Sequence, residues 1–203
     1  MFISLLQSNP EFYLTWVVVV MFSICVHECC HAWMAWRQGD STAVNQGYLT
    51  LNPLVVMGPT SLVLLTLFGI AWGAVPVTPS RLRHSYGRAV VSGSGPAANI
   101  ALFLAFFMVY IGARIAGVDL IAMVGRVGML ANGFLFMFNL LPVPGLDGWD
   151  VFELLIPAMR RMPRETRTRA GWIILLVILF TGAYRVFWTA SAWVTDGMIA
   201  LLP

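Results

Sequence analysis

Three polar side chains that can do chemistry stand together in an apolar stretch of this 203-residue chain: His27, Glu28 and His31. On a helix, two imidazoles four residues apart project from nearly the same face, which suits a shared metal ion. Glu28 is rotated from His27 by about 100°, so it can take a proton from a water molecule at the metal without binding the ion itself. The spacing predicts a zinc site for hydrolysis, with His27 and His31 as ligands and Glu28 as the general base.

The apolar surroundings favour the same interpretation. A charged side chain near the centre of a bilayer costs about 2.5 to 3.5 kcal/mol, so this polar group needs a compensating partner such as a metal ion and a local water pocket. The alternative is that the three side chains only form hydrogen bonds to neighbouring helices.

A catalytic zinc ion usually has three protein ligands and one open position, so one more ligand is needed. Among nine carboxylates, Asp147 is the best placed, because it directly follows a long apolar run. Pro142 and Pro144 precede it and remove backbone donors, so irregular backbone is expected there. Asp150, one helical turn further on, is the alternative ligand, although its expected role is to begin a helix.

The composition predicts an all-α, polytopic transmembrane helix bundle with four to five spanning helices and a re-entrant segment. Hydrophobic residues make up 59% of the chain and charged residues 10%, against about 25% charged in a soluble domain. Residues 1–203 are expected to form one integral-membrane domain whose catalytic core is about residues 12–155. The partner implied throughout is the lipid bilayer.

The arginines indicate topology and not a nucleic-acid partner. One cluster, with Arg81, Arg83 and Arg88, lies between apolar runs, and five more arginines lie between residues 160 and 169. Both connections are therefore expected in the cytoplasm, which places the site towards that side of the cell membrane. Residues 54–77 would then begin and end on one side, so they are expected to re-enter or lie shallow. An ordinary fifth crossing is the alternative.

Two motifs far apart in the chain resemble those of the site-2 protease family of intramembrane zinc metalloproteases. His27-Glu28-Cys29-Cys30-His31 matches its His-Glu-x-x-His helix, and Asn139 to Gly148 matches its Asn-x-x-Pro-x-Pro-x-Leu-Asp-Gly motif. The likeness covers about residues 20–155 and is closest to the compact bacterial and archaeal members. It implies three helices around zinc, cleavage of a substrate's transmembrane segment near the cytoplasmic side, and substrate positioning by Asn139, Pro142 and Pro144.

The chain also departs from the family pattern, in residues 54–77. Val56 and Gly58 stand where compact relatives often carry His and Asp, and no Lys precedes the Val75-Pro76-Val77 stretch. These departures affect substrate handling and leave the zinc site untouched. Two rival functions are a catalytically idle membrane scaffold that binds transmembrane partners and, less favoured, a metal transporter. The sequence predicts neither the substrate nor the oligomeric state.

Four further residues have weaker predicted roles. Gly95 and Asn99 are expected to serve helix packing and an interhelical hydrogen bond, respectively. Cys30 lies about 60° from His27 around the helix, on the other side from His31, and could reach the ion, although small-residue packing is its expected role. His84 is expected to be a solvated loop residue.

Overall fold

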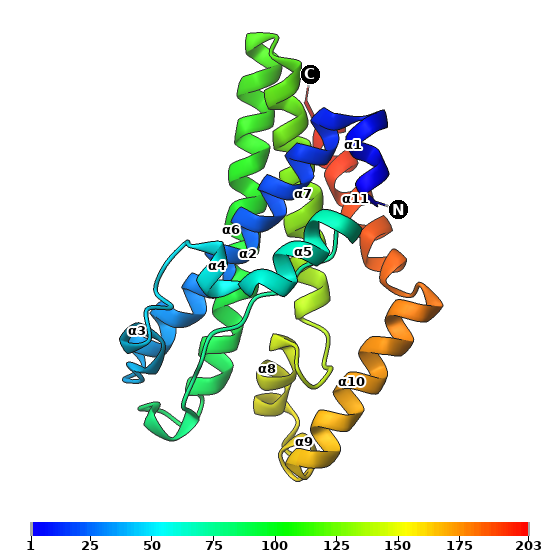
Figure 1. The fold of residues 1–203 in the computed structure, drawn as a ribbon. Coiled ribbons are helices and arrows are strands. Elements are labelled where there is room, and N and C mark those ends of the chain that lie inside the picture. The colour runs from blue at the N-terminus through cyan, green and yellow to red at the C-terminus, as the bar shows by residue number, and fades with distance from the viewer. Residues whose placement is uncertain (1, 203) are drawn as a thin grey trace.

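The computed structural model describes residues 2–202, and between these residues the chain forms helices and connecting segments with no β-strand. The all-α prediction is confirmed (Figure 1). In chain order the helices are η1 (Phe2–Ser4), α1 (Leu5–Ser8), α2 (Pro10–Arg37), α3 (Thr42–Asn45), α4 (Pro53–Val56), α5 (Gly58–Phe68), η2 (Pro79–Arg81), α6 (Gly87–Ala116), α7 (Asp119–Asn139), α8 (Asp147–Leu155), α9 (Pro157–Arg160), α10 (Arg164–Thr181) and α11 (Tyr184–Ala200).

Three helices of the described chain are long and apolar enough to cross a membrane: α2, α6 and α7. They pack against one another, with α6 and α7 as an antiparallel pair and α2 beside both (Figure 1). The turn between α6 and α7 uses Gly117, whose φ of 70° is left-handed and favours glycine. Close approach depends on small residues of α7, since a Cβ on Gly125 would lie 2.7 Å from the backbone nitrogen of Tyr110.

Residues 54–77 do not cross the membrane as one helix, so the alternative of an ordinary fifth crossing is wrong. The longest helix there, α5, has 11 residues and is about 16 Å long, which is short of the ~30 Å hydrocarbon core. After Gly69 the chain runs back along α5 without regular secondary structure (Figure 1). The Ser61 hydroxyl pairs with the polar backbone groups of this returning segment: it donates a hydrogen bond to the Trp72 carbonyl and accepts one from the Trp72 amide.

The C-terminal apolar run also differs from a simple span. This run, residues 172–195, is not one straight helix, because the chain turns by 68° between α10 and α11. Gly182 ends α10 with a φ of 75°, in the left-handed region. Counting this bent pair as one span gives up to four crossings, the lower of the two numbers expected.

The two arginine-rich connections lie at the same end of the bundle. Residues 81–88 lead from η2 into the first turn of α6 and residues 160–169 lead from α9 into α10, and both stand at the end where α2 finishes (Figure 1). The chain thus brings both positive clusters to the end at which the histidine-bearing part of α2 lies.

Candidate metal centre

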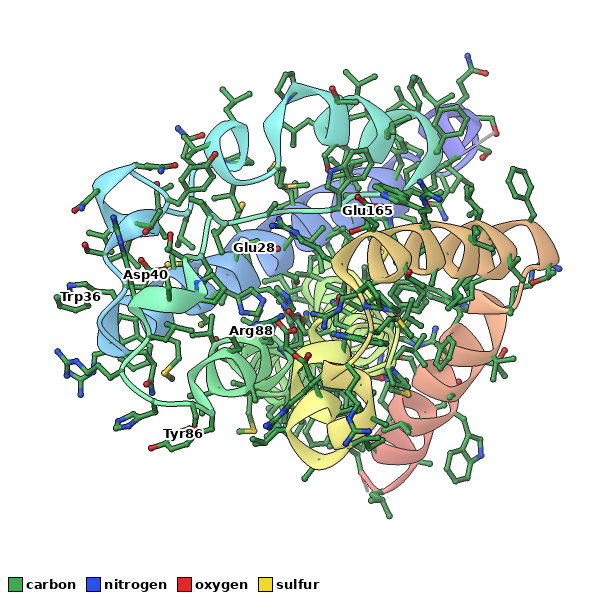
Figure 2. All side chains as sticks on the ribbon, turned by 90° about the horizontal axis from the view of Figure 1, so that it is seen from below. Glu28, Trp36, Asp40, Tyr86, Arg88 and Glu165 are labelled. Atoms are coloured by element: carbon green, nitrogen blue, oxygen red, sulfur yellow. The ribbon has the colours of Figure 1, made fainter. Side chains whose placement is uncertain are left out.

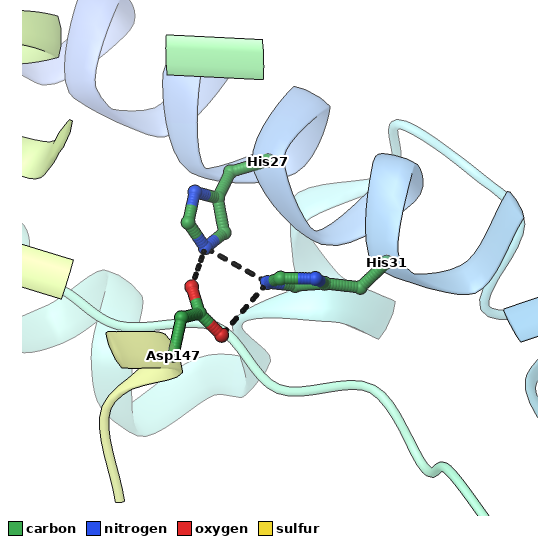
Figure 3. Close-up of side chains that lie close together, drawn as sticks. All are labelled: His27, His31 and Asp147. Carbon is green, nitrogen blue, oxygen red and sulfur yellow. Dashed lines mark hydrogen bonds and ion pairs between the residues drawn. The ribbon is translucent and has the colours of Figure 1, made fainter. Parts of the chain in front are cut away.

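Three side chains from distant parts of the sequence converge at the inner face of α2. The Nε2 atom of His27 lies 3.1 Å from Oδ2 of Asp147, and Nε2 of His31 lies 3.3 Å from Oδ1. The two Nε2 atoms are 3.0 Å apart (Figure 3). All the potential ligand atoms fall within 4.8 Å of one another, so His27, His31 and Asp147 are close enough to hold a metal ion.

The donor set fits zinc. Oδ2 of Asp147 is buried without a hydrogen-bond partner, and His31 donates from Nδ1 to the Val91 carbonyl over 2.8 Å, because a carbonyl oxygen can only accept. In the neutral ring, Nε2 of His31 therefore turns a lone pair towards the carboxylate. Lone pairs of buried nitrogen and oxygen atoms that face one another repel, and a cation between them removes this repulsion. Two imidazoles and one carboxylate are a typical ligand set of catalytic zinc.

The histidine side of the site depends on close contact between α2 and α6. His27 and His31 are both buried, and Gly95 of α6 lies directly against them. A Cβ at Gly95 would overlap both imidazoles, with His27 Nε2 at 2.5 Å. The packing role predicted for Gly95 is confirmed, and the structure adds that the groups it packs against are the two candidate ligands.

The aspartate side is built from the segment after α7. Helix α7 ends at Asn139, residues 140–146 form an irregular loop, and Asp147 begins α8. The irregular backbone expected around Pro142 and Pro144 is confirmed. Gly148 allows α8 to pack on this loop, since a Cβ there would overlap the Leu140 carbonyl.

Helix α8 is tied to its neighbours by ion pairs. Asp150 pairs with Arg88 of α6 and accepts a hydrogen bond from Ser92 over 3.1 Å. Burial raises the pKa of the Asp150 carboxyl, although the Arg88 guanidinium opposes this shift. Glu153 pairs with Arg167 of α10 at 2.9 Å and with Arg88 at 3.3 Å.

The alternative ligand positions are not brought to the centre. Asp150 is turned towards α6 and its arginine, and neither Asp150 nor Cys30 belongs to the group of possible metal ligands found among the described residues. His84 stacks on Tyr86 at a centroid distance of 4.9 Å, away from the site. These positions support Asp147 as the third donor.

Glu28 lies beside the histidines and is buried, at 8% exposure. It faces the returning segment of residues 70–78, where a Cβ on Gly73 would lie 2.5 Å from Cγ of Glu28. Figure 2 shows Glu28 on α2 near the middle of the molecule, with Arg88 of α6 also there. The contact with Gly73 was not foreseen, because the sequence alone does not tell where the residue lies after the chain turns back.

The returning segment is fastened at its far end by Asp40, which follows α2 (Figure 2). The Asp40 carboxylate accepts hydrogen bonds from the Thr42 amide at 3.0 Å and from the Thr78 amide at 2.6 Å. Burial alone would raise the pKa of this carboxyl, but the hydrogen bonds outweigh it and hold the pKa below its usual value. The path of the segment past Glu28 is thus fixed at both ends, by Ser61 and by Asp40.

An apolar cavity of about 910 Å³ opens beside the site. His27, Glu28 and Asp147 line it, as do Asn139 and side chains from the returning segment, α7 and α10. Of the residues predicted to position substrate, Asn139 therefore faces the cavity. Pro142 and Pro144 are not among its lining residues and instead shape the loop before Asp147.

Comparison with known proteins agrees with this geometry. The model of peptidase family M50 matches residues 113–182, which include Asp147 and its motif. Two relatives carry the name "Putative zinc metalloprotease": YwhC of Bacillus subtilis is 34% identical over 85% of this chain and 83% of its own length. Rip2 of Mycolicibacterium smegmatis is 32% identical over 87% of this chain and 71% of its own length. No solved structure gives a significant match.

The fold and the site thus define a multi-pass membrane zinc metalloprotease. The chain belongs to peptidase family M50, the site-2 proteases, as the two sequence motifs indicated. Zinc is its cofactor, and His27, His31 and Asp147 lie close enough together to hold it.

Proposed function

We propose that this protein hydrolyses a peptide bond within or near the transmembrane segment of a membrane-protein substrate, with zinc held by His27, His31 and Asp147. The observation that carries the proposal is the convergence of these three donors, within 4.8 Å, beside a large apolar cavity between spanning helices. A transmembrane segment of a substrate that enters this cavity exchanges lipid contacts for apolar protein contacts. Its peptide bonds then lie next to the three metal ligands and Glu28.

Glu28 is the general base of the proposed reaction. Bound zinc supplies a Lewis acid that polarises the scissile carbonyl and makes the attacking water more acidic. Glu28 accepts the proton of that water on its carboxylate and returns it to the leaving amine. The contact with Gly73 fits this role, since it holds the carboxylate beside the cavity that His27 and His31 also line.

Asn139 is proposed to hydrogen-bond the substrate, since its side chain stands where α7 ends and the cavity begins. Pro142 and Pro144 would act with it by shaping loop 140–146, so that the loop leaves room for the substrate next to Asp147. Residues 12–155 are proposed as the catalytic core of one domain that comprises residues 1–203.

The active site is proposed to face the cytoplasm, because both arginine clusters lie at its end of the bundle (Figure 1). Reporter fusions after Arg88 and after Arg164 should both read cytoplasmic, and a fusion near Val118, between α6 and α7, should read external. An external signal after Arg88 would reverse the orientation.

The test of catalysis is Glu28→Gln in the purified, zinc-loaded protein, reconstituted with candidate single-pass membrane proteins. The neutral amide cannot accept the proton, so cleavage should stop while zinc content stays the same. Glu165→Gln is the matched control, because Glu165 is exposed at the start of α10. If the protein is an idle scaffold, neither the parent nor the Glu28→Gln protein should cleave its partners. If the Glu28→Gln protein still cleaves the substrate, Glu28 is not the general base.

A further inference from the structure

A row of buried hydrogen bonds leads away from His27 through the centre of the bundle. Nδ1 of His27 lies 2.7 Å from Oδ1 of Asn99 on α6, and Nδ2 of Asn99 donates to Oδ1 of Asn132 on α7 over 2.9 Å. Asn132 in turn donates from Nδ2 to the Ser23 hydroxyl and to the Gly128 carbonyl, each at 2.9 Å. Both amide side chains are completely buried.

The direction of every hydrogen bond in this row follows from the Gly128 carbonyl. A backbone carbonyl can only accept, so the nitrogen of the Asn132 amide must face it and the oxygen must face Asn99. That oxygen accepts from the Asn99 nitrogen, which leaves the Asn99 oxygen facing His27. Nδ1 of His27 must therefore carry a hydrogen, and in the neutral ring, the form that binds a metal, its Nε2 turns a lone pair towards Asp147.

We propose that Asn132 is a positioning residue for the metal centre: it fixes the orientation of the Asn99 amide and, through it, the form of His27 that can bind zinc. This inference rests on the proposed role of His27 as a ligand. Asn132 lies on a helix that contributes no ligand, yet it does for His27 what the Val91 carbonyl does directly for His31. The alternative is that Asn132 has a purely structural role and only joins α7 to α2 through its hydrogen bond to Ser23.

The loss of Asn132 has a specific consequence for His27. Without an acceptor on α7, the side-chain amide of Asn99 can flip, so that its oxygen and nitrogen exchange places and the nitrogen faces His27. Nδ1 must then accept, the ring hydrogen moves to Nε2, and that atom can no longer bind the metal. Partners that orient a ligand in this way are typically worth 10- to 100-fold in metal affinity.

The experiment compares zinc affinity, measured by competition with a chelator, for the full-length protein and three variants. Asn132→Leu should weaken zinc binding about 10- to 100-fold. Asn132→Asp keeps an oxygen for Asn99 and should bind zinc far more tightly than the leucine variant. Ser23→Ala should have little effect, because the Gly128 carbonyl still orients Asn132. If Asn132→Leu binds zinc as the parent does, or if the two Asn132 variants lose affinity equally, Asn132 is only a packing residue and the proposal is wrong.

Two further measurements separate this inference from the ligand assignment. His27→Ala must itself lower zinc affinity; if it does not, the ligand set fails. If His27→Ala weakens binding and Asn132→Leu does not, the ligand set stands and the positioning role fails.

The chain has three histidines, so ¹⁵N labelling of histidine alone can report which ring nitrogen of His27 carries the hydrogen in the metal-free protein. At a pH at which the His27 ring is neutral, the hydrogen should lie on Nδ1 in the parent and move partly to Nε2 in Asn132→Leu, and an unchanged pattern would contradict the proposal.

Discussion

The two sides of the metal centre are held in place by different kinds of interaction. On the histidine side, His27 and His31 are fixed by neutral hydrogen bonds to Asn99 and Val91 and by helix packing against Gly95. On the aspartate side, Asp147 stands on a short helix that ion pairs tie to α6 and α10.

Position in the bundle explains the difference. The histidine side lies among the spanning helices, where charged partners are costly to insert, so uncharged amides and carbonyls take their place. The aspartate side lies at the end of the bundle that carries the arginines, where water lowers that cost. The aspartate side should therefore be the more sensitive to salt and the histidine side the more sensitive to changes in volume.

The largest expected effect is that of Asp147→Asn, which removes the carboxylate from the three converging donors. Zinc content should fall and activity should be abolished, while the bundle stays folded because the packing of α2, α6 and α7 is untouched. Zinc by atomic absorption and cleavage of a single-pass substrate are the measurements.

Asp150→Asn is the matched control for this variant. Asp150 is one turn away on α8 and is paired with Arg88, so it should retain zinc and most of the activity. If zinc is lost in Asp150→Asn and retained in Asp147→Asn, the third ligand is Asp150, one helical turn further along α8, and the assignment of Asp147 is wrong.

The next effect is that of Gly95→Ala on the histidine side. The new Cβ would overlap the imidazoles of His27 and His31, and such overpacking costs about 1 to 3 kcal/mol. Zinc affinity should therefore fall between about five- and 150-fold. Gly112→Ala, on the same helix but with no atom near the new Cβ, should bind zinc as the parent does; equal losses in both would mean that the close contact at Gly95 has no special role.

The smallest effect is that of Glu153→Gln on the aspartate side. This change removes the ion pairs of Glu153 with Arg167 and Arg88. Glu153 is buried, but both arginines are partly exposed and the amide oxygen of Gln can still accept their hydrogen bonds. The loss of the charge should therefore cost about 1 kcal/mol, so activity should fall about fivefold. The loss should shrink at high salt, where the parent pairs are already screened. Kinetics at low and high salt will show whether the aspartate side depends on these charges; a loss independent of salt would contradict the comparison.

Much of the site could be predicted from local patterns. The spacing of His27 and His31 follows from helix geometry, and the prolines before Asp147 mark the end of a helix, so the three donors could be named from the sequence. Asn132 could have been noticed as well, because a polar residue in the middle of an apolar run is costly without a partner. The identity of that partner could not be predicted, since Asn99 and Ser23 lie on two other helices and no sequence spacing relates them to Asn132.

The sequence by itself indicated the class of protein, through two motifs that resemble those of the site-2 proteases, and it predicted the three donors from the same two motifs. The spanning character of α2, α6 and α7 follows from length and apolar composition within each segment. Only the tertiary structure decided that α10 and α11 form a bent pair, that Gly73 meets Glu28, and that α7 supports His27 through Asn132. These features depend on which side chains meet across helices. Such contacts are set by the packing of the whole bundle, and local sequence patterns do not encode them.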